Sequence, residues 1–154
     1  MISIDNISKH LDVLDTILEW HRDEWGDDWA EQVRKSTNPD SIPTLYVALQ
    51  NGKPVGTAML LNVDMHTHPE LRPWLGGVYV PQTHRGQGIA SKLTRHAMQA
   101  AAKMGVKKLW LYTDSAPKLY ENLGWQHVAH EDYLGKPAVI MSFDFESLPF
   151  PKTH

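Results

Sequence analysis

The spacing of apolar and polar positions predicts a short strand and then two helices at the start of the chain. Residues Ile2–Ile4 alternate as a strand does, and Ser8 is placed to cap a helix that ends near Trp25. Gly26 interrupts the helical pattern, and a second short helix over Trp29–Lys35 follows it. The first helix has an apolar face made of Ile7, Leu11, Leu14, Leu18 and Trp25, which Val13 and Ile17 widen.

A β-hairpin and a glycine-containing strand are predicted next. Apolar segments over Thr44–Leu49 and Val55–Val63 flank Asn51-Gly52, a dipeptide typical of two-residue hairpin turns. A polar loop over Asp64–Pro73 leads into a strand over Leu75–Val80. Two adjacent glycines inside that strand favour a β-bulge, because glycine weakens regular strand pairing.

The second half of the chain is predicted to contain two helices and three strands. A helix over Gly86–Met104 precedes a strand over 107–113, and Asp114 is placed to cap a helix over Ser115–Leu123. The chain then continues in two antiparallel strands, Trp125–Glu131 and Pro137–Phe145. The resulting order, β-α-α-β-β-β-α-β-α-β-β, indicates an α+β fold.

Composition and charge exclude several classes of protein. A chain of 154 residues is expected to form one domain, with a core from about residue 2 to 145 and a frayed tail over 146–154. The net charge of −3 provides no basic field for nucleic acid or an anionic membrane. No apolar run is long enough to span a membrane, and the N-terminus does not resemble a signal peptide. The absence of Cys excludes disulfides, a Cys nucleophile and Cys-ligated zinc. We therefore expect a soluble cytoplasmic protein.

The segment from Val78 to Ala90 has the local design of a phosphate-binding loop. An apolar strand runs into a turn with two glycines, and the turn runs into a helix. Glycine lets the backbone approach an anion, and the first free N–H groups of the helix point toward it. The P-loop pattern is absent because Gly88 is followed by Ile89, and a dinucleotide fingerprint requires three glycines. The pattern that does match is Arg-x-x-Gly-x-Ala, starting at Arg85.

A second motif follows the next predicted strand. The segment Asp114–Trp125 is similar to Asn-x-Ala-x-x-Leu-Tyr-Glu-x-Leu-Gly-Phe, a pattern of the GNAT superfamily of N-acetyltransferases, and Arg85–Ala90 resembles the acetyl-CoA pyrophosphate loop of that family. Asp114 departs from the usual Asn. The matching residues are Ala116, Leu119, Tyr120, Glu121, Leu123 and Gly124, with Trp125 in the aromatic position.

The resemblance implies a specific architecture and a co-substrate. It implies a mixed sheet of about seven strands with four helices, and a V-shaped cleft between the strand ending at Val80 and the strand 107–113. It further implies direct transfer of an acetyl group from acetyl-CoA to a primary amine, without a metal. A backbone N–H near Tyr79 is expected to polarise the thioester carbonyl. The residues implied to bind the cofactor are Val78, Tyr79, Val80, Arg85, Gly86, Gln87, Gly88, Ile89, Ala90 and Asp114.

The resemblance also implies a role for Tyr120, as the general acid that protonates the departing CoA thiolate. A thiolate whose pKa is about 8.5 leaves more easily when a donor already faces the sulfur. The general base stays open, because many family members carry a Glu or Asp on the strand before the loop and Trp74–Val80 contains none. That missing carboxylate motivates an alternative function, a non-catalytic acetyl-CoA sensor or interaction module. The candidate bases are Tyr79, Asp64, His66, His68 and Glu70.

Aromatic and acidic residues in the region of the first two helices favour a cationic acceptor, because aromatic faces and carboxylates both attract cations. The alternative is that the Trp residues belong to the core and the acids to the surface. The group comprises Trp20, Trp25, Trp29, Asp23, Glu24, Asp27 and Asp28.

The expected partner is a small-molecule or peptide amine, and the resemblance is compatible with a homodimer. The residues expected to contact the acceptor are Trp25, Asp27, Asp28, His66 and His68. His66-Thr67-His68 with Asp64 also has the alternation of metal ligands, but without a fixed motif a loop at the rim of the acceptor site is the favoured interpretation.

Overall fold

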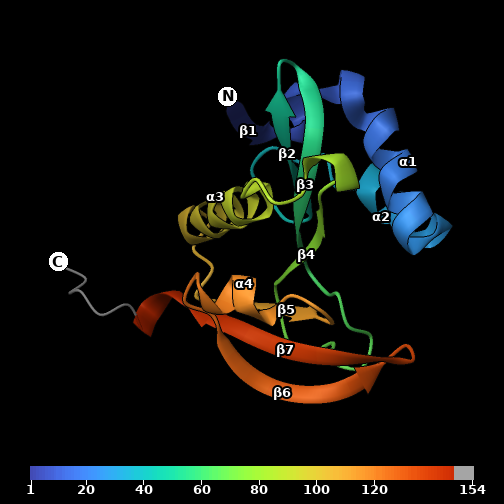
Figure 1. Cartoon of the computed structure of the whole chain (residues 1–154). Helices are drawn as coiled ribbons and strands as arrows, with labels where there is room; N and C mark the ends of the chain where they lie inside the picture. Colours follow the sequence, from blue (N-terminus) through green and yellow to red (C-terminus); the bar gives the residue numbers. More distant parts are fainter. Residues whose placement is uncertain (148–154) are drawn as a thin grey trace, which may run out of the picture.

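One mixed sheet of seven strands organises the chain, for which a computed structural model describes residues 1–147 (Figure 1). The sheet has the order β1-β2-β3-β4-β5-β7-β6, and only the β4–β5 pair is parallel. This confirms the predicted α+β class. The strands are β1 Ile2–Asn6, β2 Thr44–Gln50, β3 Lys53–Leu61, β4 Trp74–Tyr79, β5 Lys108–Thr113, β6 Gln126–Tyr133 and β7 Lys136–Asp144. Most of the predicted tail, residues 148–154, lies outside the described residues.

Helices cover both faces of the sheet. Figure 1 shows α1 and α2 on one side of β2–β4 and α3 on the other, while α4 lies beside β5. The helices are α1 Leu14–Trp25, α2 Asp27–Arg34, α3 Ile89–Lys103 and α4 Pro117–Glu121. The buried apolar residues accordingly form two clusters. The α1 face includes Ile17, Met59 and Trp74, and the α3 face includes Leu93 and Tyr120.

The predicted start of the first helix is wrong. The side chain of Asn6 accepts the Ser8 N–H at 2.9 Å, so Asn6, and not Ser8, caps the turn that follows. That turn and the next are 3-10 segments, Ile7–Lys9 and Leu11–Val13, and α1 begins only at Leu14. The break rotates Leu11 out of the predicted apolar stripe, and its side chain is 56% exposed.

The predicted cap at Asp114 is also wrong. Asp114 is exposed, and the first turn before α4 is closed by the Thr113 hydroxyl oxygen, which accepts the Ala116 N–H at 3.1 Å. Proline has no N–H to donate and suits the first helical position, while the residue before it is driven away from helical geometry. The helix therefore starts at Pro117.

The predicted hairpin and the predicted bulge are both confirmed. Asn51 and Gly52 form the turn between β2 and β3 with φ of 53° and 77°. In the β3–β4 register Met59 faces Gly76 and Thr57 faces Tyr79, so two residues of β4 oppose one residue of β3. This extra residue in β4 is the bulge that the two glycines favoured.

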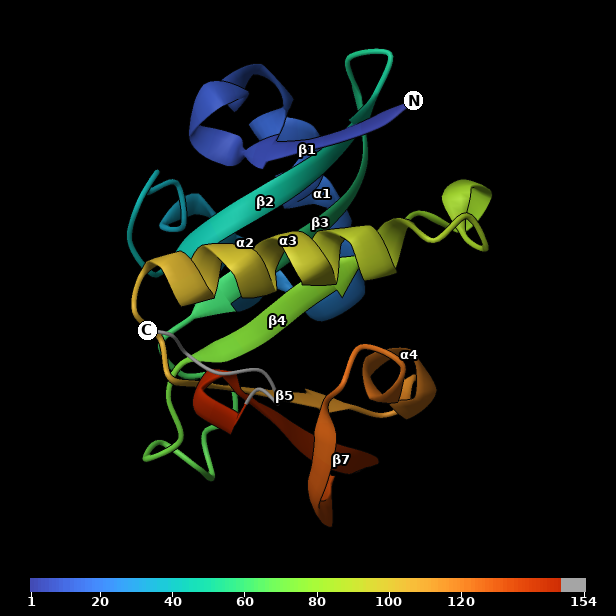
Figure 2. The same ribbon diagram turned by 90° about the vertical axis from the view of Figure 1, so that its left-hand side faces the viewer.

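Strands β4 and β5 pair at a single position, Trp74 opposite Trp110. Figure 2 shows the two strands meeting at their beginnings and diverging toward their carboxyl ends, where the loop before α3 and the short α4 stand on either side. The sheet is therefore open between β4 and β5, where the resemblance predicts a V-shaped cleft.

Candidate functional site

Two glycines shape the middle of β4, each for a different reason. A Cβ on Gly76 would lie 2.7 Å from Oδ2 of Asp64, so only glycine leaves room for that carboxylate. Gly77 has a φ of +56°, in the left-handed region that favours glycine, and a Cβ there would lie 2.7 Å from Sδ of Met59. The bulge thus depends on both residues, and it brings a carboxylate against the strand.

Asp64 reaches this position from the loop between β3 and β4. Its side chain keeps some accessible surface, but surrounding protein raises the pKa of the carboxyl group from 3.8 to about 7. Asp64 makes no hydrogen bond to another described residue. A carboxyl group with a pKa close to neutral and no fixed partner is suited to accept a proton from a bound molecule.

Two tyrosines from the opposite half of the sheet surround the same loop. The rings of Tyr112 and Tyr133 are 5.2 Å apart, and the Tyr133 hydroxyl accepts the backbone N–H of His66 at 3.1 Å. Burial raises the pKa of Tyr112 above its usual value, and the nearby carboxyl groups of Asp64 and Asp114 add to this effect. Strand β6 therefore anchors the loop that carries Asp64.

The two histidines of this loop have different surroundings. His68 lies between Glu131, at 2.8 Å, and Glu70, at 3.3 Å, and the hydrogen bond to Glu131 is the main cause of its raised pKa. The side chain of His66 is exposed. Within residues 1–147 no three His, Asp or Glu side chains are placed to hold a metal ion, so Asp64, His66 and His68 do not converge as ligands.

An aromatic wall stands on the α1 side of β4. We use this name for Trp20, Trp25, Trp29 and Tyr79. Tyr79 is its centre, with ring centroids 5.6 Å from Trp20 and 6.1 Å from Trp25. Trp25 is 44% exposed, so part of the wall faces solvent. The phenol of Tyr79 thus belongs to the wall rather than to the phosphate loop.

The acidic residues predicted near the acceptor lie at the exposed corner between α1 and α2. Asp27 forms an ion pair with Arg22 at 3.1 Å, and Asp28 is exposed in the first turn of α2. Asp23 and Glu24 are also exposed near the end of α1. Together with Trp25 they form an acidic, partly aromatic rim.

His21 lies behind the wall and was not singled out from the sequence. It is fully buried, and burial lowers its pKa to about 4, so the ring is neutral at ordinary pH. Its Nδ1 lies 2.7 Å from Nε1 of Trp29, and its Nε2 lies 2.9 Å from Oγ1 of Thr57. The available signal was its position four residues after Ile17, on the stripe of α1 that faces the sheet.

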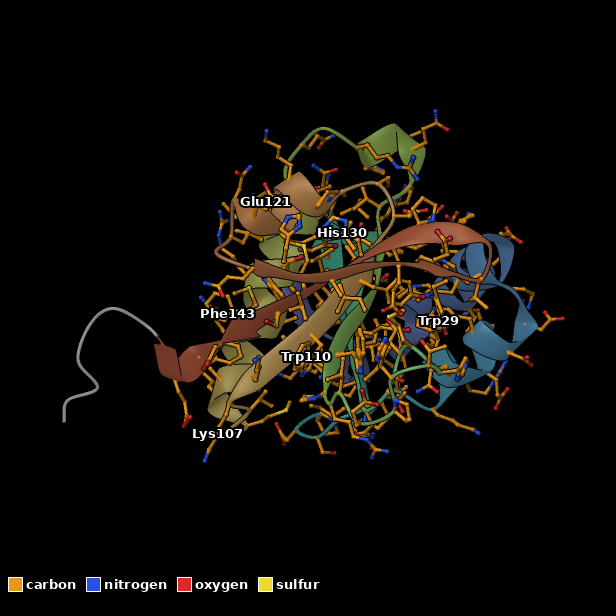
Figure 3. All side chains as sticks on the ribbon, turned by 90° about the horizontal axis from the view of Figure 1, so that it is seen from below. Trp29, Lys107, Trp110, Glu121, His130 and Phe143 are labelled. Carbon is orange, nitrogen blue, oxygen red and sulfur yellow. The ribbon has the colours of Figure 1, made fainter. Side chains whose placement is uncertain are left out.

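Tyr120 lies on the opposite face of the sheet from this group. Its ring is buried and packs edge-on against Trp125, with centroids 6.2 Å apart. Burial raises the pKa of Tyr120 to about 12, which keeps the phenol protonated. The Tyr120 hydroxyl has no hydrogen-bond partner in the described part of the chain. Every fully buried side-chain N or O atom there does have a partner, so the hydroxyl must reach accessible surface. Figure 3 shows Glu121, the next residue in α4, on the far side of the strands from Trp29.

The glycine loop before α3 has the geometry of an anion-binding turn. Gly86 and Gly88 have φ values of +80° and +78°, and a Cβ on either would meet no atom within 4 Å. The first α3 hydrogen bond joins the Lys92 N–H to the Gly88 carbonyl, so the three preceding N–H groups have no helical partner. Arg85 donates through Nε to the Val80 carbonyl at 2.8 Å, and its exposed guanidinium keeps further donors.

The predicted site residues therefore divide into groups. The loop residues Arg85–Ala90 stand at the start of α3, and Tyr120 lies on the same face of the sheet in the α3-side core. Trp25, Asp27 and Asp28 lie on the α1 side, while His66 and His68 lie near β6. Asp114 is exposed in the turn after β5. The residues that sequence reasoning missed are His21, Thr57, Tyr112 and Tyr133.

Comparison with known proteins identifies relatives of one kind. The model of the acetyltransferase (GNAT) family matches residues 14–125. N-alpha-acetyltransferase 30 of Schizosaccharomyces pombe is 32% identical over 84 residues, covering 52% of this chain and 55% of its own. Human N-acetyltransferase 8B is 40% identical over 98 residues, covering 61% of this chain and 43% of its own. The chain thus spans about half the length of these curated relatives.

Solved structures share the fold over nearly the whole chain. An aminoglycoside 6'-N-acetyltransferase complexed with coenzyme A superposes with a TM-score of 0.74 at 18% identity, over 97% of this chain and 99% of that one. Arabidopsis thaliana NAA60 in complex with acetyl-CoA has a TM-score of 0.74 at 14% identity, over 96% and 100% of the two chains. In the described part of the chain no helix is long and apolar enough to span a membrane. The matched family model includes both the glycine loop and Tyr120, and this chain belongs to the acetyltransferase (GNAT) family.

Proposed function

We propose that this protein transfers the acetyl group of acetyl-CoA to a cationic primary amine by direct attack, with Asp64 as the base and Tyr120 as the acid. The observation that carries the proposal is the position of Asp64. Its carboxylate occupies the space beside Gly76 that a side chain on β4 would fill. The loop thereby supplies the carboxylate that the strand itself does not contain.

The cofactor is proposed to enter from the α3 side. The unpaired N–H groups at the start of α3 and the donors of Arg85 suit the pyrophosphate of acetyl-CoA. The opening between β4 and β5 then leads the acetyl thioester toward the bulge. Relatives of this fold have been solved with coenzyme A and with acetyl-CoA, which supports the same co-substrate here.

The acceptor is proposed to enter from the α1 side, past the aromatic wall and the acidic rim. Aromatic faces attract an ammonium group, and the acids raise the local concentration of cations. An amine with the pKa of lysine, about 10.4, is almost entirely protonated at pH 7 and cannot attack until it loses a proton. Asp64, with a pKa of about 7, is our candidate to accept that proton.

The reaction then balances without a covalent enzyme intermediate. The ammonium group gives one proton to Asp64, and the free amine nitrogen forms a bond to the thioester carbonyl carbon. Collapse of the tetrahedral intermediate breaks the carbon–sulfur bond, and the Tyr120 hydroxyl protonates the leaving thiolate. The second amine proton restores the phenol, and Asp64 releases its proton to water.

The experiment is acetyl-CoA turnover with a panel of amines, namely a diamine, a polyamine, an aminoglycoside, a free amino acid and a peptide with a free N-terminus. Release of CoA thiol, together with an acetylated product identified by mass spectrometry, is the expected result with at least one of them. Tight binding of acetyl-CoA with no thiol release on any amine would instead support the sensor alternative, whose motive was the missing strand carboxylate.

A further inference from the structure

A chain of hydrogen bonds connects the helices of the acceptor side with the bulge in β4. It runs from Trp29 to His21, from His21 to Thr57, and from the Thr57 hydroxyl to the Gly77 carbonyl, at 2.7, 2.9 and 3.0 Å. We call these four residues the α1–β4 chain. His21 and Thr57 are fully buried, so these bonds are shielded from competition by water.

The direction of every bond in the α1–β4 chain is fixed by its first member. An indole N–H can only donate, so Nδ1 of His21 accepts and the ring proton is on Nε2. Nε2–H must then donate to the Thr57 oxygen, which directs the Thr57 hydroxyl hydrogen to the Gly77 carbonyl. The neutral state of the buried ring preserves this order at ordinary pH.

The last bond determines which way a peptide group of the bulge faces. In a trans peptide the C=O and the following N–H point in opposite directions. Because the Gly77 carbonyl accepts from the Thr57 hydroxyl, the Val78 N–H of the same peptide group points away from that hydroxyl. Neither Gly77 nor Val78 has a partner in the β3–β4 register, and β4 pairs with β5 only at Trp74.

We infer that the α1–β4 chain is a positioning device, which holds the Val78 N–H toward the carbonyl oxygen of the acetyl thioester. The inference rests on the proposed function, because that reaction places the thioester beside the bulge. A donor that is already oriented stabilises the developing oxyanion without reorganisation. Thr57 and His21 touch neither the thioester nor the amine in this scheme, so they are positioning residues, and the indole N–H of Trp29 acts on the bulge through them.

The test is the carbonyl stretching frequency of bound acetyl-CoA, measured by isotope-edited infrared difference spectroscopy with ¹³C-labelled acetyl groups and no amine present. Binding to the wild type is expected to lower the frequency, because the Val78 N–H polarises the carbonyl. Thr57→Val keeps the shape of the side chain and removes its hydroxyl, so most of the shift is expected to disappear. Thr57→Ser restores the hydroxyl and should restore the shift.

Thr44→Val is the matched control. Thr44 is also fully buried, and its hydroxyl donates to the Asn38 carbonyl at 2.5 Å, away from the bulge. In Thr44→Val the shift of the acetyl carbonyl frequency is expected to equal that of the wild type, while the loss of thermal stability is comparable to that of Thr57→Val. In single-turnover assays, Thr57→Val is expected to reduce acetyl transfer about tenfold, less than the loss of a whole oxyanion donor, while the Kd for acetyl-CoA changes less than threefold.

A folding defect, a failure of the inference and a failure of the proposed function give different results. If Thr57→Val does not fold, Trp29→Phe removes the indole donor from a partly exposed position and should give a smaller loss of the shift. Equal frequencies in the wild type, Thr57→Val and Trp29→Phe would overturn the inference, as would no shift in the wild type. If no amine is acetylated but the shift depends on Thr57, the positioning role stands and the proposed transferase function fails.

Discussion

Next to Gly76, a residue of the β3–β4 loop occupies the space of a strand side chain. The space for a side chain at position 76 is filled by Oδ2 of Asp64, which arrives from the β3–β4 loop. The same burial that raises the pKa of Asp64 to about 7 destabilises its charged form. A group of this kind reduces stability at neutral pH and is suited to proton transfer, and both properties can be measured.

Asp64→Asn is expected to reduce kcat/KM by about 10²–10⁴-fold, the range of a general base, and to remove the acidic limb of the pH profile near pH 7.

Asp64→Asn is also expected to change the pH dependence of stability. The carboxyl group of Asp64 stays protonated up to about pH 7 in the folded state but only up to about pH 3.8 in the unfolded state, so its contribution to stability falls as the pH rises between those values. Asn removes this loss. At pH 8 the variant should therefore be more stable than the wild type, by on the order of 4 kcal/mol at most, and at pH 4 the two should be alike. Asp132→Asn, an exposed change on β6, is the control in both measurements. Lower stability of Asp64→Asn at pH 8 would contradict the assignment.

Tyr120→Phe keeps the buried ring and removes the hydroxyl. We expect single-turnover acetyl transfer to fall about 10²–10⁴-fold, with little change in the affinity for acetyl-CoA. Tyr46→Phe is the matched control, because Tyr46 is buried in the same core cluster and burial also raises its pKa to about 12. Equal transfer rates in Tyr120→Phe and Tyr46→Phe, both folded by thermal melting, would remove Tyr120 from the mechanism.

At the scale of elements, sequence reasoning succeeded where the signal is local. The hairpin at Asn51-Gly52 and the helix after Gly88 were predicted because turn chemistry and helical periodicity depend on neighbouring residues. Neighbouring polar side chains compete to cap the turns near Ser8 and Asp114, and Asn6 and Thr113 do so instead. The predicted helix starts were therefore wrong. Such a competition depends on the path of the backbone, which composition does not reveal.

The site residues, too, could be predicted only where the signal was local in sequence. The glycine loop and Tyr120 lie in contiguous motifs and could be located from the sequence. Asp64 was one of several candidate bases, because its choice depends on how a polar loop folds back onto β4. His21 could not be assigned a role, since its partner Thr57 is 36 residues away and on another element.

The start of α3 provides a test of the cofactor site at the scale of one helix. Gly88→Val places a β-branched residue at a φ of +78° and fills the open space above the loop. Gly105→Val, beyond the other end of α3, has a similar φ of +86° and equally open surroundings, so it carries a matched strain. Calorimetry should show the affinity for acetyl-CoA reduced at least tenfold in Gly88→Val and nearly unchanged in Gly105→Val. If both variants bind like the wild type, the loop does not hold the pyrophosphate.

At the scale of the whole molecule, the two faces of the sheet have different characters. The glycine loop and Tyr120 belong to the α3 side, while Asp64, the aromatic wall and the acidic rim belong to the α1 side. The reactants of the proposed reaction therefore approach from opposite sides and meet at the bulge. Changes on one side should affect one substrate and leave the other nearly unaffected.

Neutralising the acidic rim tests this separation. Replacing Asp23, Glu24, Asp27 and Asp28 with their amides should raise the KM for a cationic acceptor and leave the KM for acetyl-CoA almost unchanged. Added salt should raise the acceptor KM of the wild type by screening, but it should have little effect on the neutralised variant. An acceptor KM that responds to neither change would assign these four residues to an ordinary solvated surface.

The opening between β4 and β5 has a consequence for how the molecule holds together. Beyond the pair at Trp74 and Trp110, β4 and β5 each have backbone N–H and C=O groups facing the opening, and no strand within residues 1–147 pairs with them there. An edge of this kind invites pairing, and on the outside of a protein it invites other chains. Between two diverging strands it instead favours a slender guest with amide groups, which is what the pantetheine arm of acetyl-CoA is. Bound acetyl-CoA would then pair with β4 and β5 as a temporary eighth strand, and the sheet would lose that strand each time the product CoA leaves.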